Sequence, residues 1–152
     1  MRTVFPIAAF LAFSLAATAV RPATPANPST DEQRIEALEA RAGQAEPRDQ
    51  CFLYAQVVQQ MTELSIRQYA AGDVTRANGL LQHIQKIVQK IHLNLTDNDK
   101  RLKNAELLLS RTAFRLNEML QSSSIENRPL VQQTLAQVTD AQNAAMMQVF
   151  HK

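Results

Sequence analysis

Apolar residues recur at three- and four-residue steps along most of the chain, which is the spacing of one face of an α-helix. The pattern is clearest over positions 74–95, where the apolar side chains occupy one face about 120° wide on a helical wheel. We therefore expect an amphipathic helix here, covered by other helices along that face. The face consists of Ala77, Leu80, Leu81, Ile84, Ile87, Val88, Ile91 and Leu95.

The same spacing, together with signals for helix ends, predicts four further helices. Thr30 with Gln33, or Ser29 with Glu32, makes a capping box at the start of the first one. Gly72 suits the position just after a helix end. Helices joined by short loops predict an all-α fold, an antiparallel four- to five-helix bundle, with an array of helical hairpins as the alternative. The five expected helices span about positions 30–43, 47–71, 74–95, 98–121 and 127 to the C-terminus.

The N-terminus has the pattern of a cleaved signal peptide. Arg2 supplies a positive charge, residues 4–15 form an apolar run too short to cross a bilayer, and Ala17-Thr18-Ala19 is a small-x-small cleavage site. No later apolar run is long enough to span a membrane, so we expect a periplasmic or secreted protein without a transmembrane segment in its mature chain. The expected division is a signal peptide over 1–19, a flexible Pro-rich leader over 20–29 and a single helical bundle domain over 30–152.

Charge and cysteine content narrow the picture further. The formal net charge is only +2, and Arg2 of the signal peptide contributes one of the positive charges, so the basic excess of a nucleic-acid binder is missing. Cys51 is the single cysteine, which excludes an internal disulfide. A position near a helix start lowers the pKa of a thiol, which makes Cys51 a candidate reactive thiol. Because Cys51 shares a stripe with Tyr54 and Val58, the alternative is a small buried hydrophobe.

No signature of a familiar enzyme or cofactor site occurs in the sequence. His-Glu-x-x-His, Gly-x-Ser-x-Gly, Gly-rich phosphate loops, Glu-x-x-His and Cys-x-x-Cys-His are all absent. We therefore expect a protein that is not an enzyme and holds no cofactor. The one candidate metal site is Met147 with His151, whose thioether and imidazole suit Cu(I) or haem, with Met61 or Met119 as a further ligand. Against it, Met at helical spacing commonly fills gaps in a core.

The helix expected over 74–95 also has a basic stripe and no acidic residue. One interpretation is attraction to an anionic surface such as lipid headgroups, which would give peripheral membrane contact. The other is that the stripe flanks the core and pairs with Glu63, Glu106 or Glu118 of neighbouring helices. The stripe consists of Arg76, His83, Lys86 and Lys90, which fall within about 80° of one another on the wheel.

The helices expected over 47–71 and from 127 onward have faces rich in uncharged amides, which indicate either contact with protein or an ordinary solvated surface. Asp140 is the only charged residue over positions 130–150. Three stretches, 50–54, 100–106 and 146–150, resemble small exported all-helical proteins of bacteria to which no activity is attached. We predict an exported helical-bundle interaction module with a protein partner or a second copy of itself. A copper- or haem-binding bundle and a chaperone-like holdase are the alternatives.

Overall fold

The computed structural model describes residues 29–93, 95 and 99–150, and the expected signal peptide and His151 lie outside them. The described part contains five helices and no strand, which confirms the predicted all-α fold. None of its helices combines the length and the apolar character needed to cross a bilayer. The helices are α1 (Thr30–Gln44), α2 (Pro47–Ala70), α3 (Val74–Leu93), α4 (Asp99–Ser122) and α5 (Arg128–Phe150).

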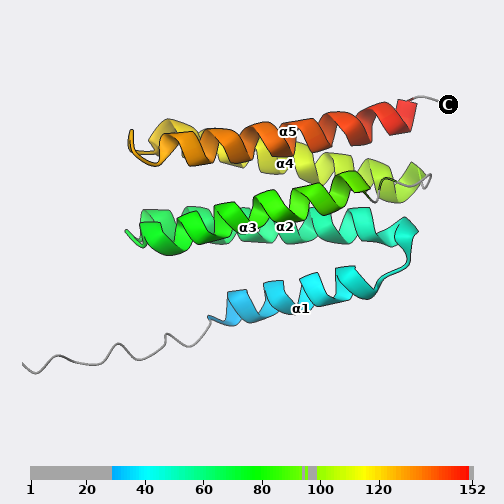
Figure 1. Cartoon of the computed structure of the whole chain (residues 1–152), viewed down its shortest axis with the longest axis horizontal. Coiled ribbons are helices and arrows are strands. Elements are labelled where there is room, and N and C mark those ends of the chain that lie inside the picture. The colour runs from blue at the N-terminus through cyan, green and yellow to red at the C-terminus, as the bar shows by residue number, and fades with distance from the viewer. Residues whose placement is uncertain (1–28, 94, 96–98, 151–152) are drawn as a thin grey trace, which may run out of the picture.

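The helices lie in three layers, and helices consecutive in sequence run antiparallel (Figure 1). Helices α2 and α3 form one hairpin, and α4 and α5 form a second. The two hairpins stack so that α2 contacts α4 and α3 contacts α5, which places α3 diagonally across from α4. Helix α1 packs on α2, on the side of the first hairpin that faces away from the second.

Local sequence signals set the ends of these helices. Of the two capping boxes considered, the pair Ser29 and Glu32 is the one that forms: the Ser29 hydroxyl accepts from the Glu32 amide at 3.3 Å, and the Glu32 carboxylate accepts from the Ser29 amide. Gly72 follows α2 with a φ of +84°, a left-handed conformation that glycine adopts without strain. Asp73 then caps α3 by accepting from the Arg76 amide at 3.2 Å.

The core lies between the stacked hairpins and confirms the face expected over 74–95. Six of the eight residues of that face are buried, while Leu80 and Leu95 are partly buried. Helix α1 buries only Ile35 and Ala42, so it is a peripheral element on a four-helix core. The largest fully buried side chains are Met61, Leu81, Ile84, Ile87, Ile91, Leu109, Leu116, Val57, Val58, Val88, Val131 and Val138.

Candidate functional site

The basic stripe on α3 forms part of the surface on which α1 rests. The carboxylate of Glu39, from α1, lies 3.0 Å from His83 Nε2 and 3.4 Å from Lys90 Nζ. These two basic residues are seven apart, so both face the same side of α3. One glutamate of α1 therefore bridges two members of the stripe.

The other two members of the stripe differ in their surroundings. Arg76 pairs with Asp73 at 3.8 Å, whereas Lys86 is exposed and has no ion pair within the described residues. Three of the four basic residues are thus engaged by acidic side chains, and the acceptor from a neighbouring helix is Glu39. The three glutamates considered from the sequence bond elsewhere: Glu63 and Glu118 to Arg115, and Glu106 to Gln142.

Cys51 lies in the first turns of α2 with its side chain in the core, where it is 3% exposed. Burial raises the pKa of the Cys51 thiol to about 11, because a thiolate loses its hydration there. The shift is opposite in direction to the lowered pKa that made Cys51 a candidate reactive thiol. The thiol is therefore protonated at neutral pH, as expected for a small core hydrophobe.

We expect the Cys51 thiol to weaken the fold at alkaline pH. In the unfolded chain it ionises near its ordinary pKa of 9.0, while in the folded chain it keeps its proton up to about pH 11. The unfolded state then binds fewer protons, so the free energy of unfolding falls across this window by about 1.4 kcal/mol per pH unit. Urea unfolding of the native chain and of Cys51→Ala, under reducing conditions from pH 7 to 10.5, measures this effect. A stability difference between the two chains that stays constant with pH would contradict it.

Of the candidate metal ligands Met147 and His151, the structure describes only Met147, because His151 lies outside the described residues. Met147 is exposed near the end of α5, together with Met146. Met61 and Met119, which the sequence offered as further ligands, are core side chains. Among the residues that the structure describes, no three His, Cys, Asp or Glu side chains are grouped to hold a metal ion.

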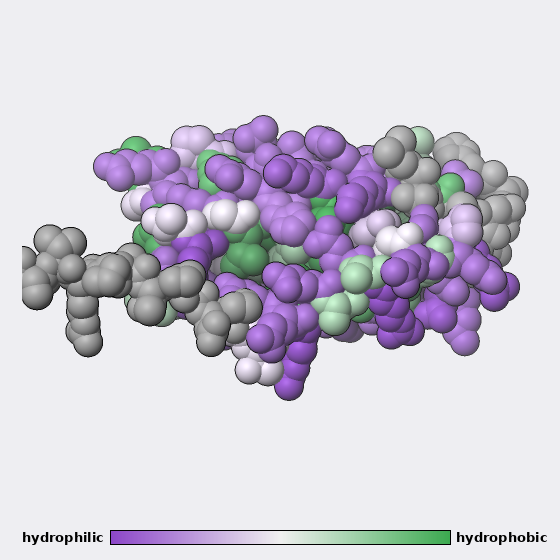
Figure 2. Space-filling view, turned by 60° about the horizontal axis from the view of Figure 1, so that its bottom comes forward, coloured by the Kyte–Doolittle hydropathy of each residue, from purple (hydrophilic) through white to green (hydrophobic). Residues whose placement is uncertain are grey.

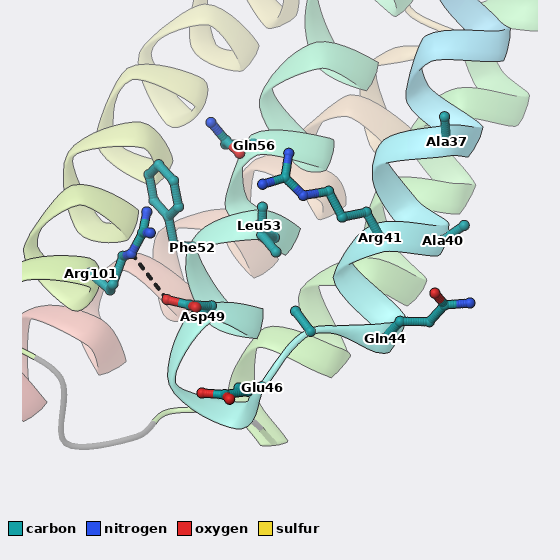
Figure 3. A pocket seen from close by; sticks show the side chains of 11 residues that line it. Ala37, Ala40, Arg41, Gln44, Glu46, Asp49, Phe52, Leu53, Gln56 and Arg101 are labelled. Atoms are coloured by element: carbon teal, nitrogen blue, oxygen red, sulfur yellow. Dashed lines mark ion pairs between the residues drawn. The ribbon is translucent and has the colours of Figure 1, made fainter.

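An open groove of about 620 Å³ runs beside α2, between α1 and α4 (Figure 3). Arg101 of α4 pairs there with Asp49 at 3.0 Å, and its guanidinium lies 5.1 Å from the centre of the Phe52 ring. Arg41 reaches into the groove from α1 and has no ion pair in the described part of the chain. Charged and amide side chains make up about half of the lining. These polar lining residues are Arg41, Gln44, Glu46, Asp49, Gln56 and Arg101.

Exposed apolar side chains gather on the second hairpin. Six large ones are exposed in the described residues, and all belong to α4, to α5 or to the turn that joins them. In contrast, hydrophilic side chains dominate the face on which α1 lies (Figure 2). The outward side of the second hairpin, which no helix of the described residues covers, is therefore the candidate functional surface. The exposed large apolar residues of this hairpin are Leu107, Phe114, Ile125, Met146, Met147 and Phe150.

Leu107 and Phe114 are not among the site residues predicted from the sequence. These two residues are seven apart, so they share one line along α4, and they lie on the side opposite to the buried Leu109 and Leu116. The signal was present in the helical wheel, since both fall well outside the apolar face that directs α4 into the core.

Comparisons with known proteins name no function for this surface, because no family model, curated protein or solved structure matches the chain.

Proposed function

We propose that this chain is an exported helical-bundle module that acts by binding protein through the outward side of the α4–α5 hairpin. The observation that supports this proposal is the confinement of all six exposed large apolar side chains of the described residues to that one hairpin. Apolar side chains gathered on one surface, when a soluble protein leaves them uncovered, mark interaction sites. Phe and Met are also among the residues enriched at protein interfaces.

The polar groups around these side chains favour the same conclusion. Helix α5 has a single charged residue, Asp140, over positions 130–150, and the other polar residues in this range are amides and hydroxyls. Uncharged groups lose less free energy than carboxylates or ammonium groups when a partner excludes water. Gln132 and Asn143 are exposed on α5 and can hydrogen-bond with a partner at the edge of such a contact. The surface thus combines apolar anchors with polar groups whose desolvation costs little free energy.

Site-specific photo-crosslinking tests the proposal. A photoactivatable phenylalanine analogue in place of Phe114 reports on contacts of the second hairpin in cells that export the chain. The same analogue in place of Gln82, which is exposed on α3, is the matched control. We expect a discrete protein adduct from position 114 and none from position 82. No adduct at position 114, or the same adducts at both positions, would contradict the proposal.

A further inference from the structure

The order of residues on the exposed side of α4 is complementary to the same order read backwards. Lys103, Leu107, Phe114 and Glu118 follow one another at spacings of four, seven and four residues. At 3.6 residues per turn they fall within about 60° of one another, and we call this set the α4 stripe. A twofold axis that crosses α4 between positions 110 and 111 sets Lys103 opposite Glu118, and Leu107 opposite Phe114.

Each member of the α4 stripe is exposed. Leu107 is 48% exposed and Phe114 is 63% exposed. Lys103 is exposed and has no ion pair within the residues described. Glu118 is also exposed, and it shares the guanidinium of Arg115, which bonds to Glu63 as well. The stripe therefore offers two apolar groups between one unpaired cation and one accessible carboxylate.

We infer that the α4 stripe is the contact surface of a homodimer in which the α4 helices of two copies pack antiparallel. The inference rests on the proposed function and names its partner as a second copy of this chain. A twofold interface requires a surface that is complementary to itself, and the reversed order of the stripe provides this. Parallel packing would instead bring Lys103 beside its own copy and Glu118 beside its own copy, which like-charge repulsion disfavours.

The dimensions of α4 suit this contact. The helix has 24 residues, a length of about 36 Å, and the stripe covers about 22 Å of it. That length corresponds to about two heptads of a helix pair. Ser110 and Arg111 flank the axis, each about 50° from the centre of the stripe on opposite sides. Ser110 is small, and the stem of Arg111 lies along the contact while its charge stays in solvent.

Charge reversal tests the inference by sedimentation equilibrium of the purified exported chain. Lys103→Glu and Glu118→Lys each place like charges at both ends of the contact, so each should weaken the dimer by about tenfold or more in Kd. The double variant, Lys103→Glu with Glu118→Lys, restores opposite charges and should recover native affinity. Lys86→Glu is the matched control and should leave Kd unchanged, since Lys86 is an exposed lysine on α3 with no ion pair among the described residues.

Loss of the apolar contact gives a second readout. Leu107→Gln with Phe114→Gln should leave the chain monomeric, with circular dichroism and thermal unfolding showing that all variants remain folded. A chain that is monomeric at every concentration, a dimer indifferent to these changes, or a double reversal that fails to restore affinity would overturn the inference. If the chain is monomeric while position 114 crosslinks to another protein, the homodimer is excluded and the proposed function stands. An adduct of twice the chain mass from position 114 supports both.

Discussion

Leu109→Ala is expected to lower the free energy of unfolding by about 2–5 kcal/mol. Leu109 is 0% exposed and lies in the core between the two hairpins. Truncation removes the transfer free energy of the lost carbons and leaves a cavity that the packed helices close only in part. Urea unfolding followed by circular dichroism, at concentrations low enough for the chain to be monomeric, measures the change.

Leu107→Ala is the matched control for this prediction. It makes the same chemical change two residues away on the same helix, but at a side chain that is 48% exposed. We expect it to change the free energy of unfolding by less than about 0.5 kcal/mol. Equal losses from the two variants would mean that the inward and outward sides of α4 are assigned wrongly. Such a result would also remove the basis for the α4 stripe as a contact surface.

Much of the fold follows from local sequence, because helix ends and helix faces are set by residues close in the chain. The apolar period over 74–95 identifies α3 and its buried face. Gly72 and Asp73 mark the turn before it, and both adopt the roles that their side chains indicate. Each of these signals acts within one or two helical turns, so a single sequence contains it completely.

The order of the helices in space does not follow from such local signals. A helical wheel gives the direction in which a helix buries its side chains, and it says nothing about which helix lies there. The stacking of α2 on α4 therefore depends on shape and packing across the core. For the same reason, the acceptor for His83 and Lys90 is Glu39 of α1, a residue distant in sequence that no spacing rule selects.

The candidate surface could not be predicted from the sequence either. Leu107 and Phe114 belong to no predicted apolar face, and sequence reasoning that looks for the core passes over them. Their meaning depends on knowing that the other side of α4 is already buried by α2 and α5. Once the inward side of α4 is known, the two exposed apolar residues on the outward side indicate a contact surface for a partner.

Ile35→Asp is expected to release α1 from the bundle while α2 to α5 remain folded. Ile35 is 4% exposed and is one of two buried residues in α1, whereas α2 buries ten. A carboxylate without a partner in that apolar site costs several kcal/mol. Helix α1 can avoid this cost by detaching, because it contributes only Ile35 and Ala42 to the buried core.

The ion pairs of α1 are too weak to hold it against such a cost. Arg67 pairs with Asp31 at 2.8 Å, and Glu39 pairs with His83 and Lys90, all at partly exposed sites where such pairs contribute about 0–1 kcal/mol. Trypsin cleavage within α1, at Arg34 or Arg41, should accelerate by about a hundredfold or more, with a protected fragment that begins near α2. Ala37→Asp, which adds the same charge at an exposed position of α1, should stay as resistant as the native chain. Unfolding of the whole bundle in the Ile35 variant would show instead that α1 is an integral part of the core.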